Sequence, residues 1–228
     1  TTVAPADAVA RGWVAHRQRQ VRLGLPSGAL ADRVADAASA LLCSTVGEDV
    51  ELAEGRRPDP EEEALVCGAL DVLGLHEEAA AVLGSIEERI ALDGYLGDRD
   101  GRLDANGALL CALGTHVALS GATDLAEALA GPIAKAAHWI DRKRHPRRAR
   151  QAPRIGGALP DGPGPRWCGG TGTWMRDLSW SLAGMRRAGW LLERAGQFEA
   201  SAALGPSLDL LEQEVEALVA TAERAGVV

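Results

Sequence analysis

The clearest structural signal in this chain is the run ALGTHVALSGATDLAEALAGPIAKAAHWI at residues 112–140. An apolar helical stretch ends at Gly121, a few small or polar residues follow, and a second stretch rich in Ala and Leu begins. A glycine at this point favours a left-handed helix stop, and so short a link makes the second helix return antiparallel to the first. Residues 112–140 are therefore predicted to form an αα-hairpin.

The same plan occurs twice more, at residues 69–90 around Gly74 and at residues 182–211 around Gly196. Three αα-hairpins in series, separated by longer loops, indicate a helical toroid or solenoid rather than a closed four-helix bundle. Of these we expect an all-α toroid, complete or partial. Apolar periodicity and capping residues predict about eight helices, with a break or kink at Pro206. Their expected ranges are 6–22, 27–42, 59–73, 76–90, 105–119, 124–144, 177–194 and 198–224.

The composition agrees with packed helices in a single domain, 1–228. Of 228 residues, 46% are hydrophobic, but there is only one Tyr and one Phe, so strand-forming residues are scarce. The net charge of −8 disfavours a nucleic-acid partner. There is no run of 18 uncharged apolar residues and no visible signal peptide, so we expect no membrane partner and a cytoplasmic location. Most of the unusual chemistry falls in two long loops, 91–107 and 145–174.

Several stretches resemble the six-hairpin glycosidase superfamily, the (α/α)6 toroid of glucoamylase-like and trehalase-like enzymes. They are DPEEEALVCGALDVLGLHEEAAAVL from residue 59, DGYLGDRDGRLDANGALLCALGTHVALSGATDLAEAL from residue 93, GGALPDGPGPRWCGGTG from residue 156 and DLSWSLAGMRRAGWLL from residue 177. The resemblance implies a shortened toroid in which loop carboxylates hydrolyse a glycosidic bond. The chain departs from the family in having about eight helices instead of twelve, and Leu178 where a second Asp is common. The alternative is a non-hydrolytic relative, acting as a binding or assembly module or on another small molecule.

Glycoside hydrolysis requires one carboxylic acid that protonates the leaving oxygen and a second carboxylate nearby. Asp104, at the position that matches the acidic residue of the family's "D.NG" segment, is the predicted general acid, and Asn106 is placed to orient it. Asp177 is the predicted partner. Each has a structural alternative, because Asp104 also suits the N-cap of a helix and Asp177 the first turn of one.

Three of the eight aromatic residues lie in the two long loops: Tyr95, Trp167 and Trp174. Flat rings with one polar atom suit the apolar face of a sugar, so these residues are predicted to bind substrate, and anchoring of the loops is the alternative. We add Arg176, next to Asp177, to the candidate substrate-binding residues. The other tryptophans are predicted to pack in the core: Trp13, Trp139, Trp180 and Trp190.

The remaining motifs point to no cofactor. The five histidines are far apart in sequence and lack metal-ligand spacing, so no metal site is expected. DRDGRLD at 98–104 does not fit a calcium loop, and the basic run 142–150 is better explained as a solvated or partner-facing loop. The four cysteines form no CxxC pair, so neither a disulfide framework nor a zinc site is expected. The expected partners are a carbohydrate or other small molecule and a second copy that completes the ring.

Overall fold

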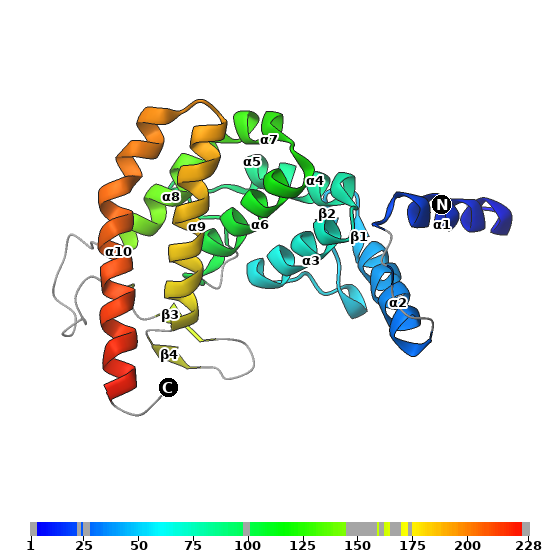
Figure 1. The fold of residues 1–228 in the computed structure, drawn as a ribbon, viewed down its shortest axis with the longest axis horizontal. Helices are drawn as coiled ribbons and strands as arrows, with labels where there is room; N and C mark the ends of the chain where they lie inside the picture. The colour runs from blue at the N-terminus through cyan, green and yellow to red at the C-terminus, as the bar shows by residue number, and fades with distance from the viewer. Residues whose placement is uncertain are drawn as a thin grey trace.

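The structure, a computed structural model, describes residues 4–21, 24, 28–97, 101–144, 159, 162–164, 170–172 and 175–224. Helices dominate these residues and pack on one another, so the all-α prediction is confirmed (Figure 1). The helices are α1 (Ala6–Arg19), α2 (Ala29–Ser44), α3 (Pro60–Val72), α4 (His76–Gly84), α5 (Ile86–Arg89), α6 (Ala105–Ser120), α7 (Thr123–Ala128), α8 (Ala130–Arg144), α9 (Met175–Arg194) and α10 (Phe198–Arg224).

Two short antiparallel strand pairs accompany the helices. They are β1 (Thr45–Val46) with β2 (Asp49–Val50), and β3 (Gly162–Pro163) with β4 (Thr171–Gly172). A single 3-10 turn, Ala53–Gly55, follows β2 and leads toward α3. Each strand has only two residues, so these pairs act as turns between helices rather than as a sheet.

The three predicted αα-hairpins are present. Their turning points, Gly74, Gly121 and Gly196, have φ angles of 77°, 76° and 71°, which is the left-handed conformation expected of a glycine helix stop. The helix after each of these glycines packs back on the helix before it, α4 on α3, α7 and α8 on α6, and α10 on α9.

Two predicted helices are each divided in two. The range 76–90 is broken at Ser85, between α4 and α5, and the range 124–144 is broken at Leu129, between α7 and α8. At the second break, Pro132 follows closely and lacks the N–H that would continue the hydrogen-bond ladder of α7. Pro206, in contrast, lies inside the continuous helix α10, so of the predicted break or kink at this position the break is wrong.

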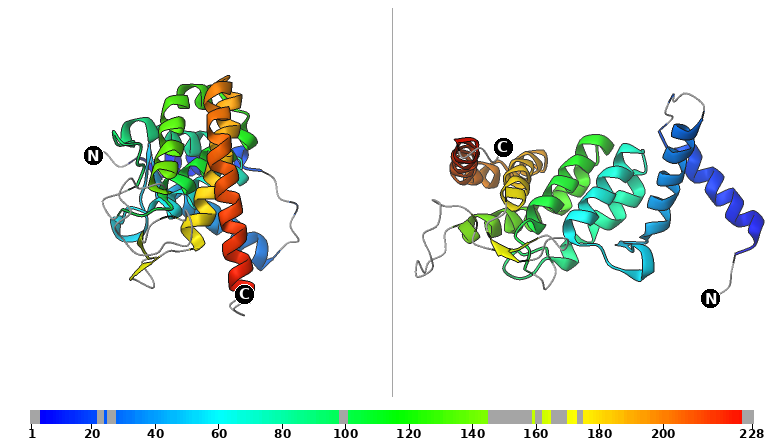
Figure 2. Two further views of the ribbon diagram at one scale, coloured as in Figure 1. Left: turned by 90° about the vertical axis from the view of Figure 1, so that its left-hand side faces the viewer. Right: turned by 90° about the horizontal axis from the view of Figure 1, so that it is seen from below.

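Helices α3, α6 and α9 lie side by side and run in the same direction (Figures 1 and 2). Arg102, just before α6, binds Glu61 at the start of α3, and His116 near the end of α6 binds Asp71 near the end of α3. The central helix α6 has buried residues on every side, as expected of a helix that is apolar all round. The N-terminal ends of three parallel helices therefore meet at one edge of the molecule.

The contact between α6 and α9 depends on two glycines. A β-carbon on Gly107 would lie 2.3 Å from the carbonyl oxygen of Trp180, and one on Gly184 would lie 2.5 Å from Cα of Gly107. The two backbones thus touch directly where a side chain cannot fit. This close approach holds the start of α6 against the first turns of α9.

Along the longest axis of the molecule, α1 and α2 lie at one end and α10 lies at the other (Figure 1). Helix α1 contains no buried residue, and Trp13 is only half-buried, so its predicted place in the core is wrong. The indole of Trp139, predicted in the same way, is buried in the main hydrophobic cluster. Within the described part of the chain, no helix is both long enough and apolar enough to cross a membrane.

Candidate functional site

The two predicted catalytic carboxylates lie together where α6 and α9 begin. The guanidinium of Arg176 joins them, because its Nε is 3.2 Å from Oδ2 of Asp104 and 3.3 Å from Oδ1 of Asp177. Because both oxygens contact the same nitrogen atom, the distance between Oδ2 of Asp104 and Oδ1 of Asp177 is at most about 6.5 Å. All three residues were predicted from sequence as site residues, and the structure brings them into one cluster.

Asp104 occupies the N-cap position of α6, but its carboxylate caps nothing. It is fully buried and accepts two hydrogen bonds from Arg102, at 3.1 Å from Nε and 2.7 Å from Nη2. With Arg176, two guanidinium groups face this one carboxylate. The structural alternative, in which the Asp104 side chain satisfies the free N–H groups of the helix, is therefore not the role that the side chain has.

Arg102 is itself buried and links the cluster to the start of α3. Its Nη2 lies 3.1 Å from Oε2 of Glu61, and its Nη1 pairs with Oδ2 of Asp59. Asp59 uses its other oxygen to accept the N–H of Glu62 at 2.9 Å and is therefore the N-cap of α3. One buried arginine thus fixes the ends of α3 and α6 relative to each other.

Asp177 lies in the first turn of α9 and is only 1% exposed. Its Oδ1 accepts a hydrogen bond from Nη2 of Arg176 at 3.0 Å, whereas its Oδ2 is buried with no hydrogen-bond partner among the described residues. Burial and the neighbouring charge of Asp104 raise the pKa of Asp177 to about 6, against the opposing effects of Arg176 and Arg102. Asp177 therefore keeps its proton to a higher pH than an ordinary aspartic acid and loses it as the pH rises through about 6.

Glu61 and Trp180 also belong to the cluster, although neither was predicted as a site residue. The indole Nε1 of Trp180 donates to Oε1 of Glu61 at 3.0 Å, and Nη1 of Arg176 lies 3.6 Å from Oε2 of Glu61. Trp180 was predicted to pack in the core, and its partly buried ring does pack against the main hydrophobic cluster. One feature of the sequence could have indicated this cluster. Glu61, Asp104 and Asp177 each lie in or next to the first turn of a helix, α3, α6 and α9 respectively.

Asn106 is fully buried but does not orient Asp104 through a hydrogen bond. Its amide instead holds the loop before α6, because Oδ1 accepts from the N–H of Leu96 at 2.9 Å and Nδ2 donates to Gly94 O at 2.8 Å and to Ala136 O at 3.0 Å. The Asn106 side chain therefore provides hydrogen-bond partners for three backbone groups. Its placement corrects the orienting role expected from the sequence.

Tyr95 lies beside the cluster. Its hydroxyl donates to the backbone oxygen of Arg102 at 3.0 Å, and its ring stacks on Trp139 with the centroids 4.8 Å apart. The tyrosine therefore supports the backbone that carries Arg102. The other two predicted sugar platforms, Trp167 and Trp174, lie outside the described residues.

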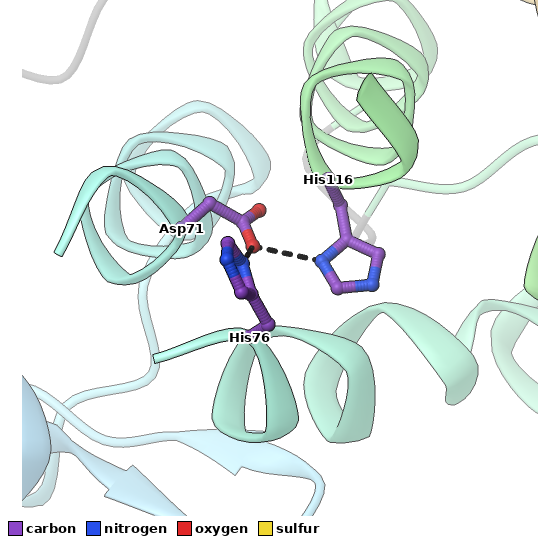
Figure 3. A group of neighbouring side chains, drawn as sticks. All are labelled: Asp71, His76 and His116. Carbon is purple, nitrogen blue, oxygen red and sulfur yellow. Dashed lines mark hydrogen bonds and ion pairs between the residues drawn. The ribbon is translucent and has the colours of Figure 1, made fainter. Parts of the chain in front are cut away.

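A second polar cluster lies at the opposite ends of α3 and α6. Nδ1 of His76 and Nδ1 of His116 are each 2.8 Å from Oδ1 of Asp71 (Figure 3). The expectation that the histidines stand apart is therefore wrong for this pair. A sequence signal did exist, since Asp71 and His116 precede the turn glycines Gly74 and Gly121 by three and five residues, in neighbouring hairpins.

Comparison with protein-family models found no match. Curated proteins and solved structures likewise gave none. The resemblance to six-hairpin glycosidases therefore remains a prediction from the sequence motifs.

Proposed function

We propose that the chain is a carbohydrate-active protein of the glycoside hydrolase type, with Asp177 as its proton donor. The observation that supports this most is the state of Asp177, a buried carboxyl with a pKa near 6 and one unpartnered oxygen, next to the carboxylate of Asp104. Perturbed carboxyl groups paired in this way are typical of acid–base sites.

The roles differ from those expected from sequence, where Asp104 was the general acid. Both oxygens of Asp104 are already paired with the guanidinium groups of Arg102 and Arg176, so neither is free to face a substrate. Asp177 is the better donor, because burial favours its protonated form. In the proposed step, the proton of Asp177 passes to the glycosidic oxygen as the bond to the anomeric carbon breaks, and the fixed charge of Asp104 stabilises the oxocarbenium-like transition state.

A carboxylate that water can reach is also required. Glu61 has the largest exposed fraction among the carboxylates of the cluster, 25% of its side chain. We assign Glu61 the role of the base that takes a proton from the attacking water. Arg176, with 21% of its side chain exposed, is placed to bind sugar hydroxyls between Glu61 and the two aspartates.

The arrangement of the helices supports the same proposal. Helices α3, α6 and α9 form a parallel row with α4, α8 and α10 packed against it, and we interpret this row as the inner helices of a partial α/α toroid. In such an arc the N-terminal ends of the inner helices form the face on which Asp104 and Asp177 lie. A second copy of the chain is the proposed means of completing the ring.

The alternative function is a non-hydrolytic binding or assembly module. The observation in its favour is the burial of Asp104 and Asp177, because the two carboxyl groups then face other protein groups rather than a ligand in solvent. A mainly apolar pocket of about 700 Å³ lies between α2, residues 51–53 and α3, and its lining includes Leu41, Leu52 and Val66. In this alternative function, the pocket would bind the partner.

The deciding experiment is a hydrolysis screen on 4-nitrophenyl glycosides and on α- and β-linked glucans. The proteins compared are wild type, Asp177→Asn, and Asp209→Asn as a control at an exposed carboxylate of α10. We expect hydrolysis by wild type and the control, and a loss of about 100-fold or more in Asp177→Asn, the usual contribution of a general acid. Equal activity of Asp177→Asn would refute the assignment, and no hydrolysis by folded wild type would favour the binding module.

A further inference from the structure

We propose that Asp71, His76 and His116 form a binding site for a divalent transition-metal ion such as Zn²⁺. The three residues come from the end of α3, the start of α4 and the last turns of α6, and their ligand atoms all lie within 4.8 Å of one another (Figure 3). Two imidazoles and one carboxylate are a common ligand set for zinc, and the nitrogen donors favour Zn²⁺ over Mg²⁺.

The geometry requires only a small adjustment to hold an ion. Each imidazole Nδ1 is now 2.8 Å from Oδ1 of Asp71. Ligands at about 2.0–2.2 Å from a tetrahedral ion stand about 3.3 Å apart, so each imidazole nitrogen must move about 0.5 Å away from Oδ1 of Asp71. The 36% exposure of the His76 side chain leaves one side of the cluster open to water, which would supply a fourth ligand.

Two further observations point to a ligand at this cluster. Oδ2 of Asp71 is buried and has no hydrogen-bond partner within the described part of the chain, although a buried carboxylate oxygen is costly to leave unpaired. In addition, Oγ of Ser120 lies 3.4 Å from Nε2 of His116. A proton on Nε2 that faces Ser120 leaves the Nδ1 lone pair of His116 free for a metal ion, which is the usual way in which a second residue orients a histidine ligand.

The ion would have a structural role rather than a part in the proposed hydrolysis. Glu61 and Asp71 are ten residues apart on α3, which places the two clusters about 15 Å from each other along the helix. A metal at Asp71 would join the first hairpin, α3 and α4, to the central helix α6. This inference is independent of the proposed function, and its test needs no substrate.

The test measures Zn²⁺ binding to wild type, His76→Gln and His138→Gln, each first treated with a chelator. His76 is the chosen variant because it is the ligand most exposed to solvent, so its replacement disturbs the core least. His138 is an exposed histidine on α8 and serves as the matched control. Circular dichroism verifies that each variant is folded, calorimetry gives affinity and stoichiometry, and Co²⁺ absorption reports the ligand geometry.

We expect one Zn²⁺ per chain in wild type and His138→Gln, together with a higher Tm on addition of Zn²⁺ but not of Mg²⁺. The affinity of His76→Gln should fall at least about tenfold, because loss of a direct ligand costs no less than loss of a supporting residue. Absence of stoichiometric Zn²⁺ binding to wild type would overturn the proposal and leave a hydrogen-bonded Asp–His–His cluster. Equal affinity of His76→Gln would overturn it as well.

Discussion

Replacement of Asp177 by Asn is expected to stabilise the protein at neutral pH. The pKa of this carboxyl is raised from 3.8 to about 6 in the folded chain, so the native state binds more protons than the unfolded state between these values. Stability therefore falls as the pH rises through this window. Asn has the size of the protonated side chain and carries no charge, so it removes the cost of ionising a buried group.

The magnitude follows from the size of the shift. The two pKa values differ by about 2 pH units, and each unit corresponds to about 1.4 kcal/mol, so the full effect is about 3 kcal/mol. Asp177→Asn should match wild type near pH 4 and exceed its free energy of unfolding by up to about 3 kcal/mol at pH 7. Such a gain on removal of a site residue is typical of groups held in place for function.

Urea unfolding at pH 4, 5, 6 and 7, followed by circular dichroism, gives the free energy of unfolding of each protein. Asp209→Asn, at an exposed position of α10, is the control, and its difference from wild type should not vary with pH over this range. The reasoning is refuted if Asp177→Asn is less stable than wild type at pH 7. A difference that stays constant from pH 4 to pH 7 would refute it equally, because it would mean that Asp177 does not titrate there.

Three further substitutions test the packing and charges around this site. Gly184→Ala should destabilise the fold by about 1–3 kcal/mol in urea unfolding, because its β-carbon meets the α6 backbone. Gly189→Ala on the same helix should be neutral or stabilising by up to about 1 kcal/mol, and a Gly184→Ala variant as stable as Gly189→Ala would contradict the close approach. Arg102→Gln should cost about 3–5 kcal/mol by the same assay, since it removes the guanidinium that pairs with Asp59 and one of the two that pair with the buried Asp104. Arg186→Gln at an exposed pair should cost about 1 kcal/mol or less. Arg176→Gln should move the titration of its neighbouring carboxyl to higher pH, because Arg176 lowers that pKa, and an unchanged midpoint of the pH-dependent stability would argue against their contact.

The hairpins were predictable because their signals are local. Gly74, Gly121 and Gly196 stop helices through their own conformational freedom, and the apolar faces on either side need no knowledge of distant residues. The division of 124–144 at Leu129 was harder to predict, because Ala, Leu and Glu around it are all good helix formers. The half-exposed state of Trp13 was also beyond local reasoning, since it depends on which helices cover α1.

For the candidate site, the sequence predicted three members of the cluster but not their contacts. Asp104, Arg176 and Asp177 were all selected, yet nothing in the sequence indicated that one guanidinium joins both carboxylates. The buried Arg102 was missed because charged residues in a loop usually face solvent. The grouping of His76 with His116 depends on the parallel packing of α3 and α6, which brings together residues that are forty positions apart.

The most direct test of the proposed hydrolysis is its pH dependence. In the wild type, kcat/KM on the best aryl glycoside or glucan of the screen should fall as the pH rises through about 6, because Asp177 then loses the proton that it must donate. In Asp177→Asn, the residual activity should lack this dependence. A wild-type rate that stays level or increases between pH 5 and pH 7 would contradict the role of Asp177 as general acid.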